Sequence, residues 1–316
     1  MLLINHILKC GGTSFKKALS DINKTLGIEE GLTKGGYYGS SRIRFIKELE
    51  SMVARKSIPP YIFSHYTIGA PEVFLRSHKI NFCGVTFIRD PTERTKSHLM
   101  HMLRNGNLQL RSNGEIYSIF NPNVKMIDYL ENYQTKWLIG YSEDPLRKDA
   151  GAAWDKLDSS KGLAHLIKAC QGNLVDNFRE SSNTGRISIF RTEDIKSFYK
   201  QYIDLMAYIY SKKPLNKGKI IEAALKQRDN ASSKKLKLYM ENISSSNITK
   251  SNHIRTFKYS RLGDLYESER FKNSLNHLLE KALKRLAWDN MLYKEVSDFS
   301  KENPKKNVLF LWEKSI

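Results

Sequence analysis

The chain has 316 residues and a mass of 36.6 kDa, which is enough for one large α/β domain or two small ones. Hydrophobic residues make up 40% of it and only 8 residues are proline, so the composition excludes a disordered or collagen-like protein. Lys and Arg total 52 against 33 Asp and Glu, and the net charge of +19 indicates anionic partners: phosphate, sulfate, nucleic acid, an acidic glycan or an anionic membrane face.

The first element of the chain is predicted to be a strand that leads through a glycine turn into a helix. Residues 2–8 form a short apolar run that stops at the sequence Lys-Cys-Gly-Gly-Thr-Ser. Beyond this turn, Phe15, Ala18, Leu19 and Ile22 recur at the spacing of one helix face.

Strands and helices alternate along the rest of the chain. We predict further strands at 61–65, 82–88 and 187–190, and helices at 43–55, from Pro91 to about 103, at 193–210 and across 271–293. This alternation favours an α/β fold with a parallel sheet, helices on both faces and a helical C-terminal part. No break in composition divides the chain, so 1–316 is expected to be a single domain with a surface excursion at 104–123 and a mobile connection at 231–252.

The glycine turn has the composition of an anion-binding loop. Glycines between a strand and a helix let backbone N–H groups approach an anion, and the helix N-terminus adds a partial positive charge. Lys9 supplies a full charge before Gly11 and Gly12, and Thr13 and Ser14 each supply a hydroxyl. The order differs from a Walker A loop, in which the lysine follows the glycines. Taken alone, the same residues also suit an ordinary helix N-cap.

The pattern His-x-x-Lys-x-Gly-Gly-Thr-Ser, which begins at His6, resembles the 5′-phosphosulfate loop of carbohydrate sulfotransferases of the heparan sulfate 2-O-sulfotransferase type. This family includes Golgi and bacterial enzymes and uses 3′-phosphoadenosine 5′-phosphosulfate (PAPS). The resemblance implies a P-loop-like sheet, and it assigns to cofactor binding the residues Lys9, Gly11, Gly12, Thr13 and Ser14. Cys10 stands where the family usually has Thr.

A second anion site is predicted after the strand at 82–88. Arg89 leaves that strand at its C-terminal end, where α/β sheets bind ligands, and Ser97 lies about two turns into the following helix. An arginine fork and a hydroxyl suit a phosphate, whereas Asp90 before a proline is typical of a helix N-cap. The pattern Arg-Asp-Pro-x-x-Arg-x-x-Ser resembles the family's 3′-phosphate motif and assigns Arg89 and Ser97 to it. Arg94 also matches, and it either braces the loop or faces solvent.

His65 is the candidate catalytic base, and Lys9 is the second candidate catalytic residue. His65 ends the strand at 61–65, at the sheet edge where Lys9 and Arg89 are also expected, and sulfuryl transfer needs a base with the near-neutral pKa of histidine. The segment Ser-His-Tyr-Thr-Ile-Gly resembles the family's sequence at this place. A half-buried structural histidine is the alternative, and the base would then be sought among carboxylates, first Glu48 and Glu50.

No metal is expected as a cofactor. His98 and His101 lie three residues apart on one predicted helix, but no Cys or carboxylate cluster completes a set of ligands. The cysteines at 10, 83 and 170 are far apart, so neither a disulfide framework nor a zinc spacing can be drawn from them. The apolar runs, such as 308–312, are too short to span a bilayer, and the N-terminus lacks the pattern of a signal peptide. We therefore expect a cytoplasmic protein.

Three further segments extend the resemblance from residue 6 to about 296. They are 132–138 (Asn-Tyr-Gln-Thr-Lys-Trp-Leu), 190–194 (Phe-Arg-Thr-Glu-Asp) and 288–293 (Trp-Asp-Asn-Met-Leu-Tyr). Each segment alone also suits core packing or capping. The basic stretch 226–261 matches nothing in the family, and we interpret it as a basic lid over a nucleotide, with Arg255 and Lys258 as contacts, or as a groove for an acidic glycan.

These features predict a PAPS-dependent O-sulfotransferase that moves a sulfuryl group to an acceptor hydroxyl. The resemblance suggests that the acceptor is a glycan or glycoconjugate, and neither nucleic acid nor a transmembrane segment is expected. One alternative is a P-loop-like kinase or nucleotide hydrolase, although the Gly-Lys-Ser/Thr ending is missing. The other alternative, a basic nucleic-acid-binding protein, leaves the two loop motifs unexplained.

Overall fold

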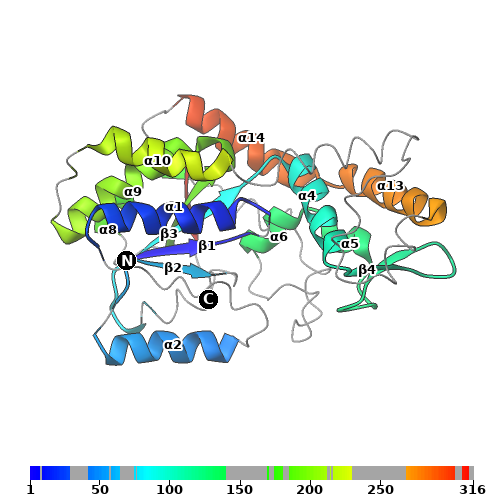
Figure 1. Ribbon diagram of the computed structural model, residues 1–316, viewed down its shortest axis with the longest axis horizontal. Coiled ribbons are helices and arrows are strands. Elements are labelled where there is room, and N and C mark those ends of the chain that lie inside the picture. The colour runs from blue at the N-terminus through cyan, green and yellow to red at the C-terminus, as the bar shows by residue number, and fades with distance from the viewer. Residues whose placement is uncertain are drawn as a thin grey trace.

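The computed structural model describes residues 1–7, 9–28, 42–56, 58–64, 75, 77–139, 169–170, 174–180, 185–211, 214, 216–229, 268–302 and 308–312. Within these ranges the protein has an α/β fold, in which a six-stranded sheet is flanked by helices (Figure 1). Four neighbouring strands of the sheet are parallel, as the alternation of strands and helices predicts.

The parallel strands lie in the order β2 (Tyr61–Ser64), β1 (Leu2–Asn5), β3 (Cys83–Ile88) and β7 (Gly185–Arg191). The first strand of the chain is therefore central. Its last residue, Asn5, is in register with Ser64 on one side and with Thr86 on the other. Every residue of β1 and β3 is buried, which is typical of parallel strands that are covered on both faces.

Two further strands extend the sheet beyond β7 in the antiparallel sense. β8 (Val308–Trp312) pairs with β7, and β6 (Ala169–Cys170) pairs with β8. The predicted parallel sheet is therefore confirmed for four strands, and two antiparallel strands that were not predicted extend it. An apolar run of this length shows that a segment is buried but not in which direction it pairs, because the direction depends on strands far away in the sequence.

Helices cover both faces of the sheet at β1, because successive side chains of a strand point to opposite faces. Leu2 and Ile4 belong to the main hydrophobic core with the apolar face of α1 (Gly12–Thr25). Leu3 belongs to a second core with Leu49 and Met52 of α2 (Arg42–Ala54). Figure 1 shows α9 (Ile195–Tyr210) and α10 (Lys217–Asp229) on the α1 side and α2 on the opposite side.

Most of the remaining helices lie beyond the ends to which the arrows of β1 and β2 point (Figure 1). They are α4 (Pro91–Arg104), α5 (Met126–Leu130), α6 (Tyr133–Ile139) and α13 (Glu269–Leu283). α14 (Ala287–Glu302) packs against α6 and β7, and α8 (Leu174–Glu180) packs against α9. None of the helices in the described ranges is long and apolar enough to cross a membrane.

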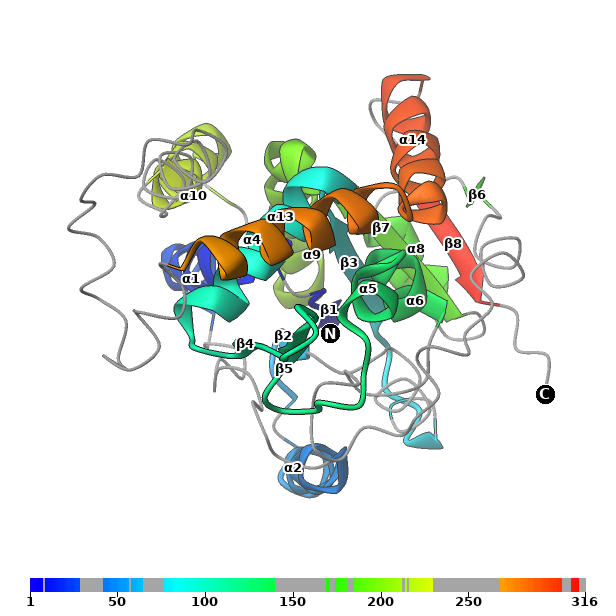
Figure 2. The ribbon, with the colours of Figure 1, turned by 90° about the vertical axis from the view of Figure 1, so that its right-hand side faces the viewer.

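The structure adds detail to two other predicted segments. The excursion at 104–123 contains a hairpin of β4 (Leu108–Leu110) and β5 (Ile116–Ser118), visible below α13 and α4 in Figure 2, and Leu108 and Ile116 are part of the main core. The helical pattern at 271–293 belongs to two helices, α13 and α14, which a short break separates. The spacing of apolar residues continues from one helix into the other. The connection predicted at 231–252 lies outside the described residues.

Candidate functional site

The order of the strands reverses between β1 and β3. From β1 the chain runs to β2 on one side, and it then crosses back to β3 on the other side of β1. In open α/β sheets, ligands bind at such a switch point, outside the carboxyl ends of the strands. The two predicted anion loops follow β1 and β3, so both leave the sheet at this point.

The loop after β1 has a conformation that depends on glycine. Gly11 is the N-cap of α1 and has a φ of 83°, in the left-handed region that favours glycine. A Cβ atom added at Gly11 would also lie 3.1 Å from the ring of Phe15. The Cys10 N–H donates to the Ile7 carbonyl at 3.2 Å and closes the turn. Lys9 is half-buried in this turn with a φ of 71°, a strained value for a residue with a side chain.

The N-cap residue of α1, Gly11, has no side chain that could cap the first backbone N–H groups of the helix. The cap residue makes no side-chain hydrogen bond, and the first turn contains no acidic residue. The first amides of an α-helix have no acceptor within the helix, and Phe15 is the first residue whose N–H bonds back, to the Gly11 carbonyl at 3.2 Å. Gly12 begins the helix as predicted, whereas the side chains of Thr13 and Ser14 lie outside the described part of the chain.

The loop after β3 begins α4 in the predicted way. Pro91 is the first residue of the helix, and the Asp90 carboxylate accepts a hydrogen bond from the Glu93 N–H at 2.9 Å, which confirms the predicted cap. The side chain of Arg89 is 31% exposed, and its Nη2 lies 3.8 Å from the Glu93 carboxylate. A half-exposed ion pair of this length is weak, so the Arg89 guanidinium is available to a stronger anion.

The two loops share one electrostatic environment. Burial raises the pKa of the Cys10 thiol to about 12, and the charges of Arg94 and Arg89 act in the opposite direction. The charge of Lys9 in turn contributes to lowering the pKa of His98 on α4. Cations from the loop after β1 and from the loop after β3 therefore lie close enough to act on each other's neighbours.

Arg94 is buried within the protein, which excludes the solvent-facing role, one of the two that the sequence left open. Its side chain is fully buried, and its guanidinium lies 3.5 Å from the centre of the Tyr133 ring and donates from Nη2 to Nδ1 of His98. Ser97, the predicted partner of Arg89, lies one turn further along α4 and is 6% exposed. The predicted role of Ser97 toward a phosphate stays a prediction.

His98 is a neutral histidine inside the protein. Burial lowers its pKa well below the ordinary value of 6.5, with further lowering by the charges of Arg94, His101 and Lys9. A guanidinium can only donate, so we assign Nδ1 as the acceptor from Arg94 and place the proton on Nε2. Nε2 lies 3.1 Å from the Tyr129 hydroxyl, to which it donates.

The low pKa of His98 predicts that acid destabilises the protein. Below pH 6.5 the unfolded chain binds a proton at His98 that the folded protein does not bind, so the free energy of unfolding falls as the pH falls. The loss reaches about 1.4 kcal/mol at pH 5.5. Urea unfolding of the wild type and of His98→Gln, whose amide can replace both hydrogen bonds, checks this between pH 7.5 and 5.5. The expectation is wrong if both proteins lose the same stability.

Gln134, at the start of α6, connects the two loops. Its Oε1 accepts hydrogen bonds from the Arg89 N–H at 2.8 Å and from the Cys10 thiol at 3.4 Å. Its Nε2 donates to the Arg89 carbonyl at 2.9 Å. The sequence indicated the segment 132–138 only by resemblance and gave Gln134 no role. Gln134 and Cys10 are 124 residues apart in the sequence, so no local pattern could predict their contact.

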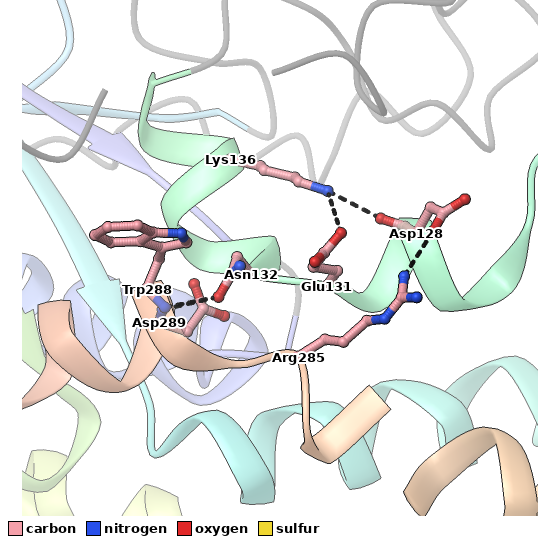
Figure 3. Close-up of polar contacts among 7 residues, drawn as sticks. All are labelled: Asp128, Glu131, Asn132, Lys136, Arg285, Trp288 and Asp289. Carbon is pink, nitrogen blue, oxygen red and sulfur yellow. Dashed lines mark hydrogen bonds and ion pairs between the residues drawn. The ribbon is translucent and has the colours of Figure 1, made fainter. Parts of the chain in front are cut away.

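α6 and α14 cap each other, and Figure 3 shows the part of this contact that Asn132 makes with the start of α14. The buried Asp289 carboxylate accepts from the N–H groups of Gln134 and Thr135, at 3.2 and 2.8 Å, and from the Thr135 hydroxyl at 2.8 Å. In return, Oδ1 of Asn132 accepts from the N–H groups of Trp288 and Asp289, at 2.9 and 3.2 Å. Burial raises the pKa of Asp289, while these hydrogen bonds and the charge of Arg94 lower it.

Two ion pairs connect α5 and the residue after it with α6 and with the segment before α14 (Figure 3). The buried Lys136 ammonium donates to the Asp128 carbonyl at 3.0 Å and pairs with Glu131 at 3.6 Å. Arg285, just before α14, pairs with the Asp128 carboxylate at 3.1 Å. The segments 132–138 and 288–293, which resemble the family separately, are therefore one structural unit beside the loop after β3.

Glu193 is a carboxylate at this site that the sequence reasoning missed as a candidate base. It follows β7, the neighbour of β3, and its charge acts on Cys10. Burial and the Glu193 carboxylate, which accepts a hydrogen bond from the Tyr293 hydroxyl, together raise the pKa of Tyr293 to about 12. The place of Glu193 at the end of a predicted strand was the signal that could have found it. Glu50 lies elsewhere, because its neighbour Leu49 packs with Met1 at the amino end of β1.

Three predicted site residues lie outside the described part of the chain: His65, Arg255 and Lys258. For His65 the structure describes the strand before it. Ser64, the last residue of β2, is in register with Asn5, so the chain leaves β2 at the same edge as β1. Of the basic stretch 226–261, the structure describes only the end of α10.

The comparisons with known proteins add no relative. No protein-family model matches the chain, and no curated protein matches its sequence. The functional argument therefore rests on the residues and their arrangement. That arrangement offers two groups of cationic and N–H donors, one after each of two adjacent strands, and it suits a ligand with two anionic groups.

Proposed function

We propose that this protein is a PAPS-dependent sulfotransferase with a P-loop-like fold, and that it sulfates a hydroxyl of a carbohydrate or glycoconjugate. One observation carries the proposal: the three predicted motifs follow three adjacent parallel strands in the order β2, β1, β3. His65 follows β2, Lys9 follows β1 and Arg89 follows β3. Local sequence patterns do not determine which strands are neighbours, so this adjacency supports the resemblance independently of the motifs.

The donors at the site fit the two anionic ends of PAPS. The loop after β1 offers the half-buried Lys9 and the uncapped N-terminus of α1, which suit a 5′-phosphosulfate. For a 3′-phosphate, the loop after β3 offers the Arg89 guanidinium, and the following helix α4 offers Ser97. The described first turn of α1 contains no carboxylate that would repel these groups.

Each residue has a separate task in this proposal. PAPS, when bound, supplies an activated sulfuryl group that is lost to the acceptor together with the release of PAP (adenosine 3′,5′-bisphosphate). Lys9 and the amides of Gly11 and Gly12 hold the phosphate side of that group and stabilise the negative charge that grows there. His65 takes the proton of the acceptor hydroxyl.

Arg89→Ala tests the proposal through ligand binding. The variant is expected to lose about 1.5–3 kcal/mol of affinity for PAP, or about 10- to 150-fold, because a charged hydrogen bond is removed. Its affinity for adenosine 5′-monophosphate is expected to stay unchanged, since this ligand lacks the 3′-phosphate. Ser97→Ala should show a smaller loss in the same direction, about 0.5–1.5 kcal/mol. Isothermal titration calorimetry measures the affinity of the wild type and of both variants for each of the two ligands.

Lys96→Ala is the matched control for these variants. Lys96 is on α4, next to Ser97, and no motif assigns it to the ligand. It pairs with Glu93 at 3.4 Å, as Arg89 does at 3.8 Å. Its removal should leave the preference for PAP intact. Tighter binding of ATP–magnesium or of a short RNA than of PAP by the wild type would contradict the proposal and favour a kinase or a nucleic-acid-binding protein.

A further inference from the structure

Beyond the ends of β1 and β3, the strand ladder no longer holds the two anion loops together. The last registered pair is Asn5 with Thr86, supported by the Thr86 hydroxyl, which donates to the Asn5 carbonyl at 2.9 Å. Lys9 and Arg89 lie three or four residues beyond this pair. Their separation therefore depends on contacts outside the sheet.

The Gln134 side chain supplies such contacts to both loops. Its Oε1 accepts hydrogen bonds from the Arg89 N–H at 2.8 Å and from the Cys10 thiol at 3.4 Å. Its Nε2 donates to the Arg89 carbonyl at 2.9 Å. Since burial keeps the thiol protonated, Cys10 acts as a donor throughout the physiological pH range. Gln134 itself is fully buried, so water does not compete for these hydrogen bonds.

The backbone of Gln134 is held by α14. Asp289 binds the backbone N–H groups of Gln134 and Thr135, and Asn132 binds the first turn of α14 in return. The position of Gln134 is therefore set by the C-terminal helix and not by either of the loops that it joins. A residue whose backbone is held independently in this way can fix, through its side chain, the distance between two otherwise separate segments.

We propose that Gln134 is a positioning residue that sets the separation between the Lys9 loop and Arg89, and that it thereby selects a ligand with two anionic groups over one with a single group. The inference rests on the proposed function, because PAP is the ligand whose two phosphates would span the loops. A glutamine that served only packing would, when replaced, weaken the binding of both kinds of ligand alike or of neither.

The test compares PAP with adenosine 5′-monophosphate on three variants. Gln134→Met keeps the length of the side chain and removes all its hydrogen bonds. Cys10→Ala disconnects only the loop after β1, and Cys10→Ser keeps a donor at that position. Calorimetry gives both affinities for each protein, and thermal unfolding shows whether each variant is folded.

We expect Gln134→Met to reduce the preference for PAP over the monophosphate by about tenfold, the size expected when the net contribution of one or two hydrogen bonds is lost. The monophosphate should bind as it does to the wild type. Cys10→Ala should reduce the preference by a smaller factor, and Cys10→Ser should restore it. Cys10→Ala leaves both hydrogen bonds between Gln134 and Arg89. It therefore tests the connection between Gln134 and the loop after β1 even if Gln134→Met does not fold.

The outcomes separate this inference from the proposed function. A wild-type protein that does not prefer PAP overturns both of them. A wild type that prefers PAP, with folded Gln134→Met or Cys10→Ala keeping the same preference, overturns only the positioning role. Equal weakening of both ligands by either variant also overturns it, since that result indicates a general loss of packing.

Discussion

Lys9→Met is expected to abolish sulfuryl transfer while the protein stays folded. The substitution keeps a long side chain in the half-buried turn and removes only the charge of the loop that leads into α1. Loss of one contact that stabilises charge in the transition state costs about 2.7–4 kcal/mol, or about 10²–10³ in kcat. The rate is measured at saturating PAPS with an acceptor found by screening oligosaccharides with labelled PAPS.

The strained backbone at Lys9 provides the control. A φ of 71° costs a residue with a side chain about 1–2 kcal/mol, and glycine adopts it without cost. Lys9→Gly is therefore expected to unfold at higher urea concentration than Lys9→Met, although both should be inactive. A rate near that of the wild type in either variant would remove Lys9 from the mechanism. Equal stability of the two would show that the strain is relieved in solution.

The two anion loops place several positive charges near one another. Arg94 acts on both Cys10 and His98, Arg89 acts on Cys10, and Lys9 acts on His98. Positive charges gathered in this way repel each other in the free protein. A dianionic or trianionic ligand relieves that repulsion, so the arrangement favours highly charged anions over neutral sugars or bases.

Local signals in the sequence were sufficient for the elements that build the switch point. The apolar runs gave β1, β2, β3 and β7, and the spacing of apolar residues gave α1, α4 and α9. At α4 the prediction extended to single contacts, because Asp90 before Pro91 has a cap role that depends only on residues within one turn. The antiparallel strands and the β4–β5 hairpin were not predicted, because distant segments determine the pairing direction and the burial there.

The same division applies to the site. Lys9, Gly11 and Arg89 are placed by the strands that precede them, so the motifs were enough to put them at one edge of the sheet. Gln134 and Asp289 act through contacts across 45 and 155 residues. Arg94 could not be assigned from its motif, because its burial depends on the ring of Tyr133, which α6 brings over it. Residues that hold a site together from other elements need the fold before their role can be derived.

His65→Ala is expected to bind PAP as the wild type does and to transfer the sulfuryl group about 10²–10⁴ times more slowly, the usual contribution of a general base. The reason for the separation is that, in the proposed function, the base contacts the acceptor hydroxyl, whereas Lys9 and Arg89 bind the nucleotide. The wild-type rate should rise with pH through about 6.5, where an ordinary histidine loses its proton, and this rise should vanish in the variant. His98 does not obscure the profile, because its pKa lies well below this range.

Two further variants make the assignment of the base decisive. His78→Ala removes an exposed histidine near the amino end of β3 and should change neither binding nor rate. Glu193→Gln removes the carboxylate that follows β7, the rival base at the same edge of the sheet. If Glu193→Gln abolishes transfer with PAP binding intact while His65→Ala does not, the base is Glu193. In that case β7, rather than β2, would supply the acceptor side of the site. The acceptor would then approach past Tyr293 and α14.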